Sequence, residues 1–321
     1  MDAIATVAAH VPAFRTDVLT GLAAPIPAVP ARWFYDHRGS ELFEEITRLP
    51  EYYPTRTEAA LLTRHSSEFA ALLGRGEAVV EFGSGSSTKT PILLQAIRPA
   101  AYVPIDISGD FLRESAASLE AEFPGLPVLP VEADFMRPIT LPDEIASMAK
   151  LGFFPGSTIG NLVARTAVDL LRAMKETLGE GSRLLIGMDR IKPIEVLLAA
   201  YDDANGVTAA FNLNLLHRIN AELDGDIPVD AFRHRAIWND PLSRIEMHLE
   251  AVRDVSFTIS GQAFSFREGA IIHTENSHKY GHRDSRLMLR AAGWGVVEEW
   301  TDEQEWFSIL LAEAEPPRFA P

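Results

Sequence analysis

Residues 78–90, AVVEFGSGSSTKT, are the part of this chain from which its fold class can be predicted. The first five of these residues are apolar except for one glutamate, as in a strand that is buried on both faces of a parallel sheet. Gly83 and Gly85 then allow a sharp turn and a close approach of the backbone to a ligand. A helix is predicted from about Thr88 to Ile97, and its first N–H groups are available to a ligand. The sequence here predicts a strand, a glycine turn and a helix that together bind a ligand.

Short apolar runs continue to alternate with helical segments as far as residue 190. The further strands predicted are AYVPID (101–106), PVLPVEAD (127–134), LGFF (151–154) and SRLLIGMD (182–189), with helices at 109–122 and 166–178. Strands this apolar, separated by helices, are typical of a mostly parallel sheet covered on both faces. The fold class predicted is therefore α/β and doubly wound.

Beyond Asp189 this alternation stops. A long helical run at 194–223 leads into two segments of alternating apolar and polar residues, 245–259 and 263–276, which predict an antiparallel sheet. From residue 285 the chain returns to a helix and two adjacent strands, which should pair antiparallel at the end of the parallel sheet. We therefore predict a core domain of residues 76–190 plus 285–321, and a second, smaller α+β domain of residues 1–75 plus 191–284.

The composition limits the possible functions. The chain has 321 residues, with 45 Asp or Glu against 29 Lys or Arg, so its formal charge is −16. This charge, without a local basic stripe, disfavours binding to nucleic acid or to an anionic membrane. The chain has no cysteine, which excludes disulfides and thiolate ligands and is typical of a reducing compartment. Since neither a signal-peptide pattern nor a membrane span is visible, we expect a cytoplasmic protein, and a monomer.

Acidic residues stand where two further strands end. Asp106 lies about 20 residues after the glycine turn, where a carboxylate can accept both hydroxyl groups of an adenosine ribose. Asp134 can accept the adenine amino group, while the ring of Phe135 packs on the base. Asp106 alone could instead be a cap at the end of its strand. Together with the glycine turn they predict an adenosyl site, because open α/β sheets bind ligands at the carboxyl ends of their strands.

Other ligands fit the sequence less well. A Walker A loop needs a wider glycine spacing, and the dinucleotide fingerprint needs a glycine in place of Thr88, so a nicotinamide-dependent dehydrogenase rests on analogy of fold alone. His278 and His282 are spaced as metal ligands on a helix would be, and His273 is near in sequence. Gly281 argues against a helix there, and no third ligand is supported, so we predict no metal site.

Several longer motifs give the chain a resemblance to one family. They are WFYDHRGSELFEEITRLPEYYPTRTEA at 33–59, EFGSGSSTKT at 81–90, PGSTIGNL at 155–162, YDDANGVTAAFN at 201–212, RIEMHLEA at 244–251 and HTENSHKY at 273–280. From about residue 15 to the C-terminus the chain resembles the histidine Nα-methyltransferases of ergothioneine biosynthesis. The resemblance implies a Rossmann-like enzyme that uses S-adenosylmethionine to convert L-histidine to its trimethylammonium betaine, hercynine.

The resemblance also implies roles for individual residues. The positions expected to hold S-adenosylmethionine are Gly83, Lys89, Asp106, Asp134 and Phe135, with Ser84 and Gly85 in the same turn. Those expected to bind histidine are Tyr52, Asn161 and Tyr201 at its amine and carboxylate end, and Met247, Glu275 and Ser277 at its imidazole. Tyr35 and Tyr52 are expected to steer the amine during catalysis, with Phe43 and Thr208 close by.

These residue types suit the chemistry. In-line methyl transfer depends on positioning, and the incoming amine must first lose its proton to a nearby acceptor or a water path. Asn161 and Tyr201 can each donate one hydrogen bond to a carboxylate. A neutral imidazole has one donor and one acceptor, which Glu275 and Ser277 can recognise, since they lie two apart and hence on one face of a strand.

Two other interpretations stay open. The substrate could be another free aromatic amino acid, as in related fungal enzymes that methylate a prenylated tryptophan. Glu275 and Met247 favour the smaller, polar imidazole, because a bulky indole would want an apolar pocket without a carboxylate. The chain could instead be a non-catalytic module that binds S-adenosylmethionine. The chain has residues that match the family's histidine-binding positions as well as its cofactor-binding positions. This disfavours a non-catalytic module, which would need only the cofactor-binding residues.

Overall fold

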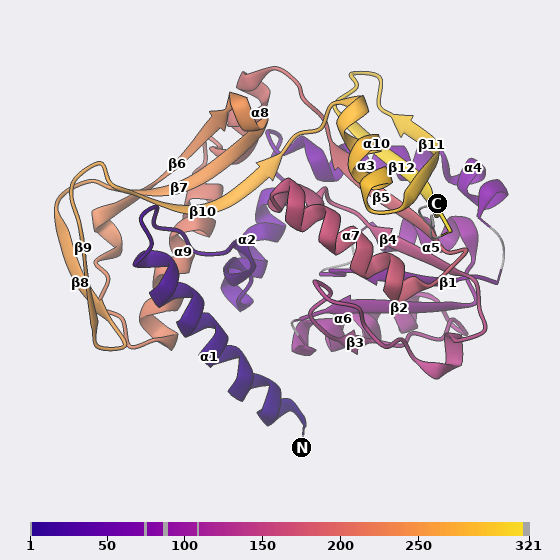
Figure 1. The fold of residues 1–321 in the computed structure, drawn as a ribbon, viewed down its shortest axis with the longest axis horizontal. Coiled ribbons are helices and arrows are strands. Elements are labelled where there is room, and N and C mark those ends of the chain that lie inside the picture. Colours follow the sequence, from indigo (N-terminus) through magenta and orange to yellow (C-terminus); the bar gives the residue numbers. More distant parts are fainter. Residues whose placement is uncertain (1, 74–75, 86–88, 108, 317–321) are drawn as a thin grey trace, which may run out of the picture. The chain divides into compact units, whose positions relative to one another are not determined.

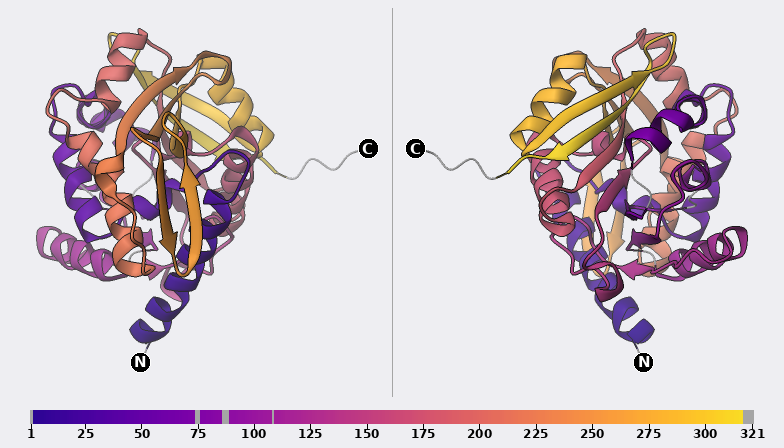
Figure 2. Two further views of the ribbon diagram at one scale, coloured as in Figure 1. Left: turned by 90° about the vertical axis from the view of Figure 1, so that its left-hand side faces the viewer. Right: turned by 90° about the vertical axis from the view of Figure 1, so that its right-hand side faces the viewer.

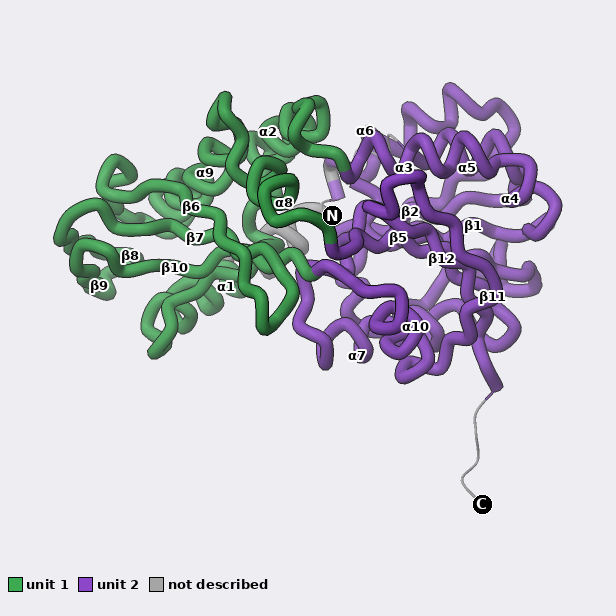
Figure 3. The backbone as a smooth tube through the Cα atoms, turned by 90° about the horizontal axis from the view of Figure 1, so that it is seen from above, with its two compact units in different colours: residues 1–53, 192–278 green, residues 54–191, 279–321 purple. Residues whose placement is uncertain are grey.

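A computed structural model describes residues 2–73, 76–85, 89–107 and 109–316 (Figure 1). The chain forms two compact units, coloured separately in Figure 3. Unit 1 comprises residues 1–53 and 192–278, and unit 2 comprises residues 54–191 and 279–321. Among the described residues, no helix combines the length and the apolar character needed to cross a membrane.

Unit 2 is built on a seven-stranded sheet in the order β11-β12-β5-β4-β1-β2-β3. Its parallel strands are β1 (Ala78–Phe82), β2 (Ala101–Asp106), β3 (Val131–Glu132), β4 (Lys150–Phe154) and β5 (Arg183–Asp189). β12 (Phe307–Ala314) pairs antiparallel with both β5 and β11 (Trp294–Thr301). β11 and β12 are the yellow strands of Figure 2. The mostly parallel sheet and its closing antiparallel pair, both predicted from the sequence, are confirmed.

Helices cover both faces of this sheet (Figure 1). They are α3 (Tyr53–Arg64), α4 (Ser66–Leu72), α5 (Thr90–Ile97), α6 (Gly109–Glu122), α7 (Ala164–Leu178) and α10 (His282–Ala291), with short 3-10 turns η2 (Asp143–Ile145) and η3 (Thr158–Asn161). Successive β1 side chains point to opposite faces. Val80 packs in one buried cluster with Met174 of α7, and Val79 in another with Leu62 of α3. The apolar run of β1 is therefore explained by burial on both sides.

The boundary between the units differs from the one predicted at residue 75. Helices α3 and α4 belong to unit 2, because Leu62 and Phe69 pack with Leu94 in the core of the parallel sheet. The predicted second domain includes residues 53–72, because no strand of the parallel sheet is predicted before residue 78. The later boundary also lies at 278 and not at 284, because Tyr280 pairs with Arg190 directly after β5.

Unit 1 combines helices with two antiparallel sheets. β6 (Phe232–Asn239), β7 (Arg244–Ala251) and β10 (Ile271–His278) form a sheet in the order β10-β7-β6, and β8 (Val255–Ile259) pairs with β9 (Gln262–Phe266). The helical elements are α1 (Asp2–Leu22), η1 (Ala31–Phe34), α2 (His37–Thr47), α8 (Ile194–Tyr201), α9 (Val207–Glu222), η4 (Val229–Ala231) and η5 (Asp240–Leu242). The two alternating segments predicted as one sheet are thus divided between two sheets, and β6 was not predicted.

The single helix predicted at 194–223 is two helices. α8 ends at Tyr201, and Asp203 caps the start of α9. The Asp203 carboxylate accepts hydrogen bonds from the N–H groups of Val207 at 3.0 Å and Thr208 at 2.7 Å. Gly206 supplies the required turn with a φ of +74°. This capping outweighs the helical propensity of the surrounding residues.

Strand β5 ends in a fully buried ion pair. The carboxylate of Asp189 lies 2.7 Å from the Lys279 ammonium, and their side chains are 1% and 0% exposed. Both residues belong to unit 2, so the pair joins the end of β5 to the segment that precedes α10. A buried charge that loses its ionic partner is strongly destabilising.

We therefore expect Lys279→Met to lower the free energy of unfolding by about 3 kcal/mol, because the Asp189 carboxylate would lose its cation. Urea denaturation measures this loss. Lys150→Met is the matched control, since the Lys150 ammonium donates to the carbonyls of Ala146 and Met148 near the surface. Equal stabilities for the two variants would contradict the prediction.

Candidate active site

The glycine turn follows β1 as the sequence predicted. Gly83 and Gly85 have φ angles of +72° and +49°, which other residues rarely adopt. A Cβ on Gly83 would lie 3.3 Å from the ring of Phe135. The N–H of Gly85 donates to the carboxylate of Asp106 at 3.1 Å. The structure thus brings the turn, the end of β2 and the segment after β3 together.

The remaining residues predicted for the cofactor lie around this turn. Ser84 is buried, and Asp134 is exposed with its carboxylate accepting the N–H of Met136 at 3.0 Å. The Phe135 ring makes edge contacts with Phe82 and Phe154, at centroid distances of 6.4 and 6.1 Å. The helix start predicted at Thr88 falls outside the described residues, and α5 begins at Thr90.

Lys89 follows the turn and forms an ion pair with Glu58 of α3. The same Glu58 oxygen accepts the N–H of Gly156, after β4, at 2.8 Å. Its other oxygen faces Gly187 of β5, where a Cβ would overlap it. The Glu58 side chain is only 1% exposed. Reasoning from the sequence missed this residue, and its place in the motif at 33–59 was the signal that could have found it.

A second carboxylate, Glu81, is buried in β1 two residues before Gly83. It accepts hydrogen bonds from the hydroxyls of Thr90 at 2.7 Å and Tyr102 at 2.6 Å. Burial raises the pKa of Glu81 to about 7, although these bonds and the charge of Lys89 lower it. Near neutral pH, therefore, this carboxyl group holds a proton in part of the molecules.

The raised pKa of Glu81 predicts a pH-dependent stability. The folded-state pKa of Glu81, about 7, exceeds the ordinary value of 4.5. The contribution of the protonated Glu81 carboxyl group to the free energy of unfolding is therefore complete below pH 4.5 and is lost as the pH rises to about 7. Glu81→Gln mimics the protonated form and removes this loss, which amounts to about 3 kcal/mol. Between pH 5 and pH 8, denaturant unfolding should show the variant gaining stability relative to the unsubstituted protein. Parallel pH profiles would count against the assignment.

The turn after β4 carries Asn161, which ends η3 and is partly buried. Two contacts fix this turn. The hydroxyl of Ser157 accepts the N–H of Asp189 at 2.9 Å, and the Tyr280 hydroxyl donates to the carbonyl of Ile159 at 3.3 Å. Burial raises the pKa of Tyr280, so its phenol remains a neutral donor. Asn161 is thereby held near the carboxyl ends of β4 and β5.

In unit 1, the aromatic residues expected near the substrate form one cluster. The ring of Phe43 lies 5.6 Å from that of Tyr35 and 6.2 Å from that of Tyr52. Tyr52 in turn lies 6.2 Å from Tyr201. All three contacts are edge-on, the arrangement that aromatic quadrupoles favour. Tyr35 is 38% exposed, whereas Tyr52 and Tyr201 are 8% and 7% exposed, so the cluster runs from the surface into unit 1.

The residues expected at the imidazole share one face of the β10-β7-β6 sheet. Glu275 lies opposite Met247, and Ser277 lies opposite Ile245. Residues that are directly opposite in antiparallel strands point to the same side. The Ser277 hydroxyl lies 2.6 Å from that of Tyr201, which brings α8 to this face. Glu275, Ser277 and Met247 are all buried.

A buried hydrogen-bond network, which was not predicted from the sequence, supports this face. The register of β10 shifts beside Thr274, whose hydroxyl donates to the side-chain carbonyl of Asn212 at 2.8 Å. The Asn212 amide lies 2.9 Å from Nδ1 of His234, and Nε2 of His234 lies 2.8 Å from the carbonyl of Tyr201. Burial lowers the pKa of His234, so the ring is neutral and accepts at Nδ1 while it donates at Nε2.

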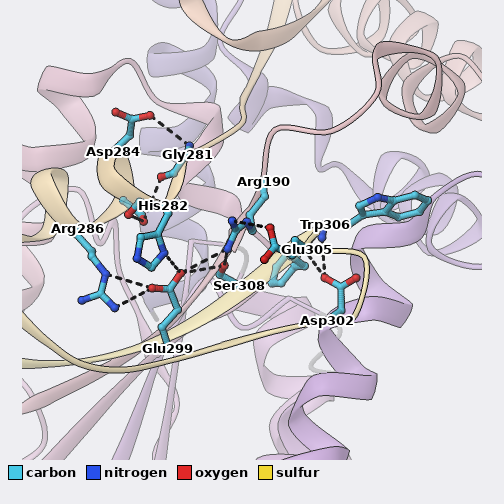
Figure 4. A network of polar contacts seen from close by, with 12 residues as sticks. Arg190, Gly281, His282, Asp284, Arg286, Glu299, Asp302, Glu305, Trp306 and Ser308 are labelled. Carbon is cyan, nitrogen blue, oxygen red and sulfur yellow. Dashed lines mark hydrogen bonds and ion pairs between the residues drawn. The ribbon is translucent and has the colours of Figure 1, made fainter.

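A separate polar network of unit 2 contains none of the predicted site residues (Figure 4). Glu299 of β11 lies 2.9 Å from Arg286 and 3.0 Å from His282, and 3.7 Å from Arg190. These side chains line a cavity of about 490 Å³. Because the Glu299 carboxylate contacts basic side chains from α10 and from the residue after β5, the network joins these two segments to β11.

The chain is similar to proteins of known activity. The model of a family described as histidine-specific, S-adenosylmethionine-dependent methyltransferases matches residues 14–314. The chain is 41% identical over 306 residues to the histidine N-alpha-methyltransferase of Mycolicibacterium smegmatis, and the match covers 94% of each protein. Its identity to that of Mycobacterium tuberculosis is 41% over 307 residues, again with 94% of each covered. It is 30% identical to ergothioneine biosynthesis protein 1 of Neurospora crassa, over 89% of this chain and 33% of that longer protein.

Proposed function

Because the chain belongs to the family of histidine-specific, S-adenosylmethionine-dependent methyltransferases, we propose that it methylates the α-amino group of L-histidine and forms hercynine, the first step of ergothioneine biosynthesis. The observation that carries this proposal is the 41% identity over 94% of the chain to a histidine N-alpha-methyltransferase. S-adenosylmethionine supplies a methyl group activated by a sulfonium. The protein's own residues supply binding, orientation and a path for the amine proton.

The residues around the glycine turn suit this cofactor. Because Gly83 has no side chain, the Phe135 ring can approach the turn, where it can pack on the adenine. Asp106 offers a carboxylate to the ribose hydroxyls. Asp134 is exposed and can accept the adenine amino group. Lys89 can bind the carboxylate of the cofactor's amino-acid end. All of these residues belong to unit 2, which we assign to cofactor binding.

The residues assigned to histidine provide polar groups in a largely buried setting. Glu275 and Ser277 recognise the two imidazole nitrogens, with Met247 packing alongside. Tyr201 and Asn161 donate to the carboxylate, with Tyr201 held by the contact of its hydroxyl with Ser277. Tyr52 and Tyr35 orient the amine, with Phe43 between them in the aromatic cluster and Thr208 at the start of α9.

Mass spectrometry of histidine incubated with the purified protein and S-adenosylmethionine tests the function directly. We expect a mass gain of up to three methyl groups on histidine and none on tryptophan. Methylation of tryptophan alone would favour the tryptophan-type alternative. No methylation of either amino acid, with normal binding of S-adenosylmethionine, would favour a non-catalytic module. Light scattering on the purified protein tests our further expectation of a monomer. We expect it in the cytoplasm because its sequence has no cysteine, which is typical of a reducing compartment.

Glu275→Ala should raise the KM for histidine by about tenfold or more, because the imidazole loses a charged hydrogen-bond partner. The affinity for S-adenosylmethionine should stay unchanged, as calorimetry can measure. Glu268→Ala, which removes an exposed carboxylate from the loop before β10, is the control and should leave both values as they are. An unaltered KM in Glu275→Ala would refute the assigned role.

A further inference from the structure

We propose that Glu58 is a positioning residue for the cofactor: it holds the Lys89 ammonium and the turn after β4 so that Lys89 can bind the carboxylate of the cofactor's amino-acid end. The inference rests on the proposed function, since it assumes that S-adenosylmethionine binds at the glycine turn. Glu58 itself is too buried to be assigned a direct contact, with 1% of its side chain exposed.

Glu58 joins segments that are distant in sequence. One carboxylate oxygen, Oε2, accepts both the ammonium of Lys89, 31 residues away, and the N–H of Gly156, 98 residues away. Gly187 of β5 provides the space for the other oxygen. Glu58 therefore holds the segment after β1 to the segment after β4, at the edge of the sheet where β5 also ends.

A carboxylate partner such as Glu58 can hold the ammonium group of a lysine in one position. The four-carbon side chain of lysine is flexible, and fixing it costs rotamer entropy that a buried carboxylate can offset before any ligand arrives. The Lys89 side chain is 14% exposed, against 1% for that of Glu58, so Lys89 is the member of the pair that a ligand can reach. An ammonium has three donors, so binding to Glu58 leaves capacity for a second anion.

The alternative is that Glu58 merely stabilises unit 2. A comparable buried pair at the opposite end of the same sheet separates the two interpretations. Glu77, directly before β1, pairs with Arg183, the first residue of β5, and the two side chains are 8% and 20% exposed. A loss of the Glu77 charge removes a similar ion pair far from the glycine turn. A general effect of stability on binding would appear in both variants.

The experiment compares two ligands by calorimetry. S-adenosylhomocysteine has the amino-acid end, and 5′-methylthioadenosine lacks it. Glu58→Gln should weaken S-adenosylhomocysteine binding by about 10- to 100-fold, as expected if a misplaced Lys89 loses its charged hydrogen bond to the ligand's carboxylate, and leave 5′-methylthioadenosine binding within about twofold. Glu77→Gln should lower stability and alter neither affinity. Should Glu58→Gln fail to fold, Glu58→Asp, which keeps the charge but not the reach, should show the same selective loss in smaller degree.

A double variant tests whether Glu58 acts through Lys89. Lys89→Met combined with Glu58→Gln should bind S-adenosylhomocysteine no more weakly than Lys89→Met alone, since coupled residues are not additive. Fully additive losses, equal losses for both ligands, or normal S-adenosylhomocysteine affinity in Glu58→Gln would each overturn the inference. Failure of the unsubstituted protein to bind S-adenosylhomocysteine or to methylate histidine would instead refute the proposed function.

Discussion

The parallel pairing of β1 with β2 and β4 is the constraint on which the rest of unit 2 depends. Val80 lies opposite Val103 on one side and Gly152 on the other, so the three strands run in the same direction and end at the same edge of the sheet. The chain leaves this edge through turns, whose N–H groups and side chains are not used by the sheet itself. The glycine turn, Asp106 and the turn that carries Asn161 are gathered there for that reason.

Several charges near this edge are buried, and their partners come from distant segments. Glu58 pairs with Lys89, and Asp189 pairs with Lys279. Glu81 instead receives two hydroxyl hydrogen bonds and keeps a proton more readily than an ordinary carboxyl group. Burial of charge is unfavourable unless such partners are supplied, so each pair fixes the position of the turns it joins. Because these turns are already held in place before a ligand binds, less binding free energy is lost in ordering them.

The sequence predicted features that depend on local pattern. The apolar runs located the parallel strands, and α6 spans the residues 109–122 that were predicted. Residues at strand ends were found because the topology of a parallel sheet determines where they lie. Partners across the chain were not found: Glu58 with Gly156, or Thr274 with Asn212, can be recognised only once the fold is known. The break between α8 and α9 was missed because Asp203 acts as a cap against otherwise helical surroundings.

A crystal structure of the protein with S-adenosylhomocysteine and L-histidine would reveal the cofactor and substrate contacts together. We expect the adenine beside Phe135, the ribose hydroxyls on the carboxylate of Asp106, and the homocysteine carboxylate on the ammonium of Lys89. We also expect the imidazole of histidine within hydrogen-bond distance of Glu275 and Ser277. Ordered ligands that contact neither Asp106 nor Glu275 would contradict these expectations.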